Sequence, residues 1–241
     1  MTRHPATRWV ELTRMKLTRY GRREWLTATV VAAISILICV LADLPAGVIV
    51  ILVLWLGFAA FFRDPVRRVP TERGVWVAPS DGRVTSVEPE SQTDDTELLG
   101  CDDAIRLSIF LSVLDVHVNR APCNLTVRDS IHRDGLYLNA MDPQSGSRNE
   151  SNTLVAEADA EFGHTRLLVR QIAGLIARRI VCATEPGNAH QRGDPFGMIK
   201  FGSRTDVVIP ATCGLHFTVQ PGDRVRAGVT IIARLDPEPD A

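Results

Sequence analysis

Two long apolar stretches lie near the N-terminus of this chain of 241 residues. No charged residue occurs in 25–42 or in 46–62, and the short segment 43–45 separates the two stretches. Each stretch is close to the shortest helix that can cross a hydrocarbon core of about 30 Å. A buried helical hairpin is the alternative, but a soluble core would then have to cover both helices on every side. The pattern therefore predicts an α-helical membrane hairpin over 25–62.

Positive charge marks both outer ends of this hairpin. Basic side chains outnumber acidic ones in 1–24, and further arginines follow the second apolar stretch, whereas the turn 43–45 has no basic residue. Because basic flanks stay on the cytoplasmic side, both termini are expected at the cytoplasmic face of the cell membrane. The segment 1–24 then reads as a basic juxtamembrane arm on anionic lipid. A cleaved signal peptide is disfavoured, since a second apolar stretch follows at once.

From residue 63 onward the pattern changes to short β-rich runs separated by Gly, Pro, Asp and Asn. Runs of this kind predict a mainly β domain over 63–241. The predicted strands are 75–78, 83–87, 105–111, 116–119, 125–131, 165–172, 177–183, 206–209, 215–219 and 230–235. The polar stretches 88–103 and 141–152 predict exposed loops.

Two segments of the β-rich part, 78–84 and 219–228, resemble the opening and closing hairpins of barrel-sandwich hybrid folds such as biotinyl and lipoyl carriers. Gly222 and Gly228 suit turn positions with positive φ. A carrier presents a modified lysine at a hairpin tip, but Lys16 and Lys200 lie in neither turn. The predicted fold is therefore mainly β, barrel-sandwich-hybrid-like with α+β elements, and a carrier function does not follow from it.

Composition removes several functional classes. A net charge of −1 argues against a general polyanion binder, so no nucleic acid partner is expected. The five cysteines are scattered without a CxxC pair, a pattern that predicts neither a disulfide framework nor a zinc site. No metal is expected.

Three polar residues of the β-rich part could carry chemistry. Ser203 follows a glycine between two strand-like runs, where the backbone can adopt strained angles. His117 lies on the polar face of an alternating run and could act as a general base, because histidine titrates near neutrality. Asp81 could orient it, as in a Ser-His-Asp arrangement. The alternatives are a plain turn at 202–203, a structural histidine, and an Asp-Gly turn.

Taken together, the motifs resemble the short form of the phosphatidylserine decarboxylase family. They are FFRDP at 61–65, APSDG at 78–82, IFLS at 109–112, DVHVNRAP at 115–122, QIAGLIARRIV at 171–181 and IKFGSR at 199–204. The resemblance extends from about residue 25 to the C-terminus, and the ordered set is specific although no single motif is. Many long-form members have Thr after the serine where this chain has Arg204, which leaves the exact lipid open.

The resemblance implies a zymogen that cleaves itself between Gly202 and Ser203 into a β chain, 1–202, and an α chain, 203–241. It implies a pyruvoyl group, formed from Ser203, as the cofactor for decarboxylation of phosphatidylserine to phosphatidylethanolamine. Asp81, His117 and Ser203 match the family's catalytic set. The partners implied are a phospholipid substrate, the membrane and the α/β heterodimer, with a dimer of such pairs left open.

Further residues near these motifs have weaker support. Arg178 and Arg179 are predicted to hold a phosphate or carboxylate of the substrate, because arginine forks suit both. A solvated or acid-paired strand edge explains these two arginines equally well. The polar loop with Asn149, Glu150 and Asn152 is expected to cover the site.

Two other hypotheses stay open. A membrane-anchored barrel-sandwich adaptor without catalysis would need neither the Gly-Ser pair nor His117 and Asp81. A decarboxylase of a related serine ether lipid would use the same residues, because the headgroup chemistry is the same.

Overall fold

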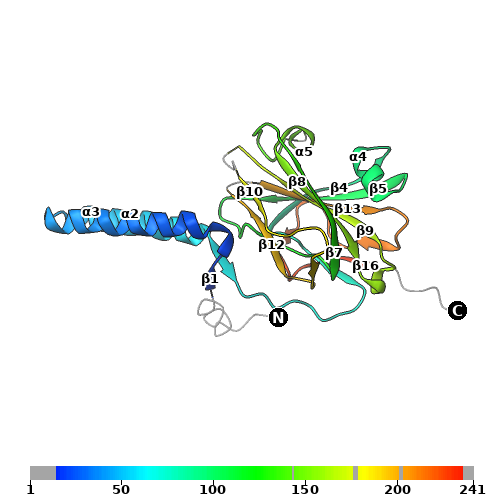
Figure 1. Cartoon of the computed structure of the whole chain (residues 1–241), viewed down its shortest axis with the longest axis horizontal. Coiled ribbons are helices and arrows are strands. Elements are labelled where there is room, and N and C mark those ends of the chain that lie inside the picture. The colour runs from blue at the N-terminus through cyan, green and yellow to red at the C-terminus, as the bar shows by residue number, and fades with distance from the viewer. Residues whose placement is uncertain (1–14, 143, 176–178, 201–202, 236–241) are drawn as a thin grey trace. The chain divides into compact units, whose positions relative to one another are not determined.

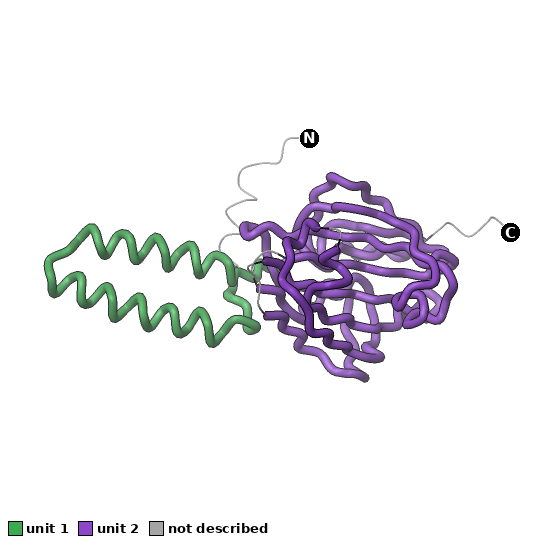
Figure 2. The backbone as a smooth tube through the Cα atoms, turned by 90° about the horizontal axis from the view of Figure 1, so that it is seen from above, with its two compact units in different colours: residues 1–66 green, residues 67–241 purple. Residues whose placement is uncertain are grey.

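A computed structural model of the chain describes residues 15–142, 144–175, 179–200 and 203–235. The chain forms two compact units, residues 1–66 and residues 67–241 (Figure 2). Gly202 and Arg178, both predicted site residues, lie outside the described residues.

The first unit contains an antiparallel pair of apolar helices (Figure 2). Its elements are β1 (Met15–Leu17), η1 (Arg19–Gly21), α2 (Arg22–Leu41), α3 (Pro45–Phe61) and β2 (Arg63–Pro65). A small sheet of two strands, β1 and β2, belongs to the same unit. Pro45 starts α3, and Trp55 Nε1 donates to Thr29 Oγ1 across the pair at 3.0 Å. The helical stretch Arg19–Leu41 is long and apolar enough to cross a membrane, whereas α3 is apolar but shorter. An apolar N-terminal helix is thus confirmed.

The second unit is mainly β, as predicted (Figure 1). Its strands are β3 (Val75–Val77), β4 (Gly82–Ser91), β5 (Asp103–Leu111), β6 (Val118–Arg120), β7 (Leu125–Arg133), β8 (Ser151–Ala158), β9 (Arg166–Ile172), β10 (Ile180–Cys182), β11 (Ala189–His190), β12 (Pro195–Ile199), β13 (Ser203–Pro210), β14 (Leu215–Phe217), β15 (Arg224–Val225) and β16 (Ile231–Leu235). An eight-stranded antiparallel sheet has the order β11-β7-β8-β9-β13-β5-β4-β15. Two three-stranded sheets, β10-β12-β6 and β14-β16-β3, complete the strand pairing.

The prediction of an exposed loop over 88–103 is wrong. Strand β4 continues to Ser91, and the helix α4 (Asp94–Leu99) follows. Thr93 and Thr96 form a capping box at the start of α4, and acidic residues occupy its first turn, where the helix dipole favours them. Leu99 packs with Leu168 and Val208 against the large sheet. In 141–152 the structure has the short helix α5 (Ser145–Arg148) and then the start of β8.

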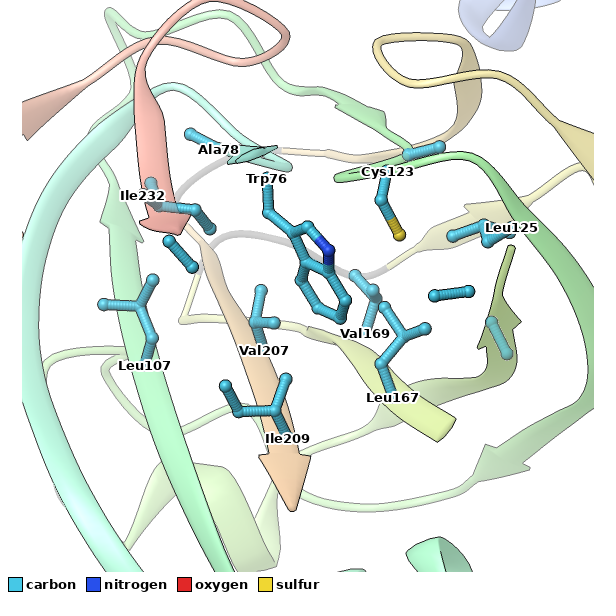
Figure 3. Close-up of a cluster of buried hydrophobic side chains, with 14 of the residues drawn as sticks. Trp76, Ala78, Leu107, Cys123, Leu125, Leu167, Val169, Val207, Ile209 and Ile232 are labelled. Carbon is cyan, nitrogen blue, oxygen red and sulfur yellow. The ribbon is translucent and has the colours of Figure 1, made fainter. Parts of the chain in front are cut away.

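Trp76 lies at the centre of the main core, and side chains from β16, β5, β13 and β9 surround it (Figure 3). Val207 and Ile209 belong to this core, whereas Val208 belongs to the cluster beneath α4. Because side chains alternate along a strand, β13 has one face toward Trp76 and one toward α4. We call these the inner and outer faces. Ser203 and Thr205 therefore lie on the inner face.

The two segments that resemble hairpins of a barrel-sandwich hybrid lie together. Strand β15 pairs with β4 at Arg224 and Arg83, and the Gly228 amide donates to the Ala78 carbonyl at 2.9 Å. Gly222 and Gly228 have φ values of 101° and 69°, the positive region expected of them. At Gly82 a Cβ would collide with the Phe110 carbonyl oxygen, so only glycine lets the turn approach β5 this closely.

Candidate active site

Ser203 opens β13, the strand between β5 and β9 in the large sheet. It is paired with Leu111 at the end of β5, and its exposed fraction is 0%. Its Oγ has no hydrogen-bond partner among the described residues. A buried hydroxyl without a partner costs about 1–3 kcal/mol, so native structures rarely keep one without a reason.

His117 lies just beyond the end of β5, after a tight turn. Within this turn the Asp115 amide donates to the Ser112 carbonyl at 2.9 Å, and Asp115 Oδ2 accepts from the Ser112 amide and hydroxyl. His117 is fully buried, and its Nδ1 lies 2.9 Å from the Asp115 carbonyl oxygen. A carbonyl only accepts, so this contact calls for a proton on Nδ1 and leaves the Nε2 lone pair for base chemistry.

A buried amide network shows how His117 and Ser203 are related. Asn119 Nδ2 donates to Thr205 Oγ1 at 3.0 Å, and Gln171 Nε2 donates to Asn119 Oδ1 at 2.9 Å. Ser203 and Thr205 share the inner face of β13, and Asn119 of β6 follows His117 by two residues.

The strand directions extend this relation to His117 and Ser203 themselves. Asn119 is also paired with Gly197 of β12, and the Ile199 amide donates to the His117 carbonyl at 3.2 Å. Strand β12 therefore runs alongside this segment in the direction from Asn119 to His117. Strand β13 runs in the opposite direction, because its third residue, Thr205, contacts Asn119. The fold thus brings Ser203 and His117 to one corner of the inner face.

Asp81 is held by an ion pair that the sequence did not indicate. Its two carboxylate oxygens accept from Arg67 at 2.9 and 2.8 Å, and Oδ1 also accepts from the Ala227 amide at 2.8 Å. The carboxylate thus joins the turn before β4 to the closing hairpin. Orientation of His117 by Asp81 stays a prediction, and Asp115 supplies the contact that the structure has at Nδ1.

Arg179 is exposed, and its carbonyl accepts from the Lys200 amide at 3.2 Å. This bond places Arg179 beside the segment that leads to Ser203. Within the polar loop, Asn149 is fully buried and donates to the carbonyls of Leu138 and Ala173 at 2.9 and 2.8 Å. Asn149 therefore holds the loop to the end of β9.

Comparison with known proteins identifies the family of the chain. The family model described as phosphatidylserine decarboxylase matches residues 55–233. A phosphatidylserine decarboxylase proenzyme of Nitratidesulfovibrio vulgaris is 43% identical over 80% of this chain and 83% of its own length. The proenzyme of Rhodococcus erythropolis is 45% identical over 73% of this chain and 72% of its own length. The chain belongs to the phosphatidylserine decarboxylase family. The resemblance seen in the motifs is thereby confirmed.

Behind the serine of this family member, on the outer face of β13, lies a buried network of charges. Arg204 donates to Asp206 through Nε at 2.6 Å and through a terminal nitrogen at 2.9 Å, and also to Ser108 Oγ at 2.8 Å. Asp95 of α4 pairs with both Arg106 and Arg170. Arg204, the residue after the serine, is therefore part of the sheet's support.

Glu90 and Arg106 of the same network pair with each other. Burial raises the pKa of Glu90, against the attraction of Arg106. Burial acts to lower the pKa of Arg106, but the surrounding carboxylates outweigh it and hold that pKa above its usual value. A cavity of about 350 Å³ adjoins this network and is lined in part by Asp95, Arg106 and Arg170. Because Arg106 and Arg170, which line the cavity, lie on the outer face, this cavity is not the space around Ser203.

Among the residues that the structure describes, no group of three or more His, Cys, Asp or Glu side chains could hold a metal ion.

Replacing Asp206 by alanine should lower the free energy of unfolding by about 3–5 kcal/mol, because it leaves the buried Arg204 guanidinium without its carboxylate. The thermal unfolding midpoint in detergent measures this loss. Glu72→Ala is the matched control, since Glu72 pairs with Arg234 where both side chains are largely exposed. Equal midpoints for the two variants would contradict a supporting role for the Arg204–Asp206 pair.

Proposed function

We propose that this protein is a pyruvoyl-dependent decarboxylase that converts phosphatidylserine to phosphatidylethanolamine after cleaving itself between Gly202 and Ser203. The observation that carries the proposal is the buried Ser203 hydroxyl, which has no partner among the described residues and shares a corner with His117. Several relatives are named phosphatidylserine decarboxylase proenzyme, and that name supports both the activity and the processing.

In the cleavage step, His117 Nε2 accepts the hydroxyl proton of Ser203, and Oγ attacks the Gly202 carbonyl carbon. The Gly202–Ser203 amide becomes an ester. Loss of the Ser203 α-proton then breaks the Cβ–Oγ bond, so Gly202 leaves as a carboxylate and the α chain begins with dehydroalanine. One water converts this end to a ketone and releases ammonia. A hydroxyl that the sheet holds in place, and that makes no competing hydrogen bond among the described residues, suits this attack.

The pyruvoyl group formed from Ser203 would supply the electron sink that lets an amino acid headgroup lose CO2. The chain's own residues would then hold and protonate the substrate. His117 would return a proton to the carbon that loses CO2, because it lies at the same corner. Arg178 and Arg179 would bind the phosphate or carboxylate of the headgroup. Asp81, fixed by Arg67, would act as a positioning residue for this corner.

The α chain, 203–241, would stay bound to the β chain after cleavage. Strand β13 is hydrogen-bonded to β5 on one side and β9 on the other. Strand β16 pairs with β3 and β15 with β4, so three strands of the α chain are paired with the β chain. This pairing supports an α/β heterodimer as the mature protein.

The membrane and the finer fold class belong to the same proposal. We place the catalytic domain, 63–241, at the cytoplasmic face of the cell membrane, with the hairpin 25–62 as its anchor and 1–24 as the basic arm. The apolar helix near the N-terminus and the arginines that flank the hairpin support this placement. The paired segments at β4 and β15 support a barrel-sandwich hybrid architecture.

Intact mass of the purified protein tests the proposal. We expect two chains, 1–202 and 203–241, with the shorter chain lighter by about 17 Da, the mass of ammonia, than a chain that begins with serine. Activity toward phosphatidylserine should accompany the two-chain form. A single chain that persists after long incubation would overturn the proposal and favour the adaptor hypothesis.

A further inference from the structure

The large apolar side chains exposed on the second unit are not spread over its surface. Among the described residues of 67–241, all of them lie in three loops that follow β5, β7 and β9, within 112–117, 134–142 and 173–175. They are Val113, Leu114, Leu136, Tyr137, Met141 and Leu175. We call this set the apolar rim. Leu114, Met141 and Leu175 are the most exposed member of each loop, at 83%, 63% and 65%.

The three loops leave the large sheet at the same end of its strands, and Ser203 lies at that end as well. We call this end of the strands the edge that carries Ser203. Ser203 is paired with Leu111 at the end of β5, and Arg204 is paired with Ile172 at the end of β9. Ser151, at the start of β8, is paired with both Ile172 and Arg133. The ends of β5, β7 and β9 and the starts of β8 and β13 therefore meet, so the rim surrounds the edge that holds the serine.

Contacts between the loops keep part of the rim together. Asn149 donates to the carbonyls of Leu138 and Ala173, and so ties the loop of Met141 to the loop of Leu175. Tyr137 donates its hydroxyl to Glu150 at 2.7 Å. The exposed apolar groups thus lie on loops that the fold holds in place. Exposing a group of apolar side chains to water costs free energy, and such surfaces mark interaction sites.

We propose that the apolar rim inserts into the surface of the lipid bilayer and brings the edge that carries Ser203 to the headgroups. A phospholipid substrate, which rests on the proposed function, keeps its acyl chains in the bilayer and must reach this edge from there. Apolar groups on several separate loops suit a fluid surface, because a lipid phase demands no shape complementarity. Tyrosine is typical of the membrane–water interface. The apolar face of an amphipathic helix that lies in this interface is buried about 5–10 Å deep, which gives the scale for the rim.

A second copy of the chain is the competing occupant. A protein interface of useful stability buries apolar side chains in a continuous, well-packed patch. Here the exposed groups are divided among three loops, with polar residues between them in the sequence. The test below separates the two occupants.

Depth of the rim can be measured in the full chain by tryptophan fluorescence in liposomes whose lipids carry brominated acyl chains. Leu114→Trp and Leu175→Trp each add one fluorophore to the native tryptophans, whose signal is subtracted with the wild-type protein. Thr212→Trp is the control, because Thr212 is exposed in the turn after β13, at the opposite edge of the sheet. We expect the rim tryptophans to be quenched and the control to remain bright. Equal quenching of all three, or of none, would overturn the proposal.

Kinetics give a second measurement with a different readout. The triple variant Leu114→Gln/Met141→Gln/Leu175→Gln should lose about tenfold or more of its rate on phosphatidylserine vesicles. Transfer of each of these apolar side chains from water into the bilayer favours the inserted state by at least about tenfold. Its rate on a short-chain phosphatidylserine below the critical micelle concentration should stay within about twofold of the wild-type rate. Its cleavage at Ser203 should be complete.

The outcomes separate the rim from the proposed function. Equal losses on both substrates would indicate damage to the site and overturn the rim proposal, as would an unchanged vesicle rate. A change in oligomeric state without any quenching would assign the surface to a second copy instead. A wild-type protein that never cleaves or decarboxylates would sink the proposed function, yet the quenching measurement would still decide whether the rim meets lipid.

Discussion

Replacing Ser203 by alanine should leave the protein as one chain with no decarboxylase activity. Alanine lacks the oxygen that attacks the Gly202 carbonyl, so neither the ester nor the ketone can form. The fold itself should survive, because Ser203 Oγ makes no hydrogen bond among the described residues. Its removal therefore leaves none of these residues with a buried polar group that has lost its hydrogen-bond partner. Intact mass and release of CO2 from phosphatidylserine measure the two effects.

The matched control is Ser151→Ala. Ser151 is also buried, and it starts β8 at the same edge of the sheet. This variant should cleave and turn over like the wild type. If Ser203→Ala were active, or if both variants lost cleavage to the same degree, the assignment of Ser203 as the origin of the pyruvoyl group would be wrong.

Replacing His117 by alanine should slow the cleavage by about 10²–10⁴-fold, the range expected when a general base is removed. The histidine has a ring nitrogen oriented by the Asp115 carbonyl and lies at the corner that holds Ser203. A time course of chain separation after synthesis of the proenzyme measures the rate. Decarboxylation should fall at least as far, since the mature chain needs the cleavage first.

His132→Ala is the control for this variant. His132 lies on β7 with about half of its side chain exposed, and it pairs with Asp134. It should mature at the wild-type rate. If His117→Ala matured normally, another group would have to take the serine proton, and Asp81, bound to Arg67, would be the next residue to examine.

Local patterns predicted the elements whose residues decide their own conformation. The apolar runs 25–42 and 46–62 correspond closely to α2 and α3. A helix pairs its own backbone N–H and C=O groups, so a run of apolar side chains is enough to make its outer surface apolar. Gly222 and Gly228 were recognised as turn residues for the same reason, since positive φ is a property of one residue.

Strand β8 was missed, although it contains eight residues in the middle of the sheet. Nearly all of its side chains are buried, so it has no alternation between polar and apolar positions for a pattern to detect. Its first residues, Ser151 and Asn152, are polar and buried, and they were taken for the end of a loop over 141–152. A cap at Thr93, three residues before Thr96, was the signal that could have revealed α4.

By itself, the sequence determined the apolar N-terminal helix, the mainly β character of the rest and the family, because these depend on composition, on single turn residues and on motifs. Only the tertiary structure decided which groups meet. Asp81 pairs with Arg67, Asp115 orients His117, and Arg204 is braced by Asp206 and Ser108 behind the serine. Strand pairing between distant segments brings these groups together. That pairing depends on burying both faces of β13 at once, a condition that no local pattern of residues records.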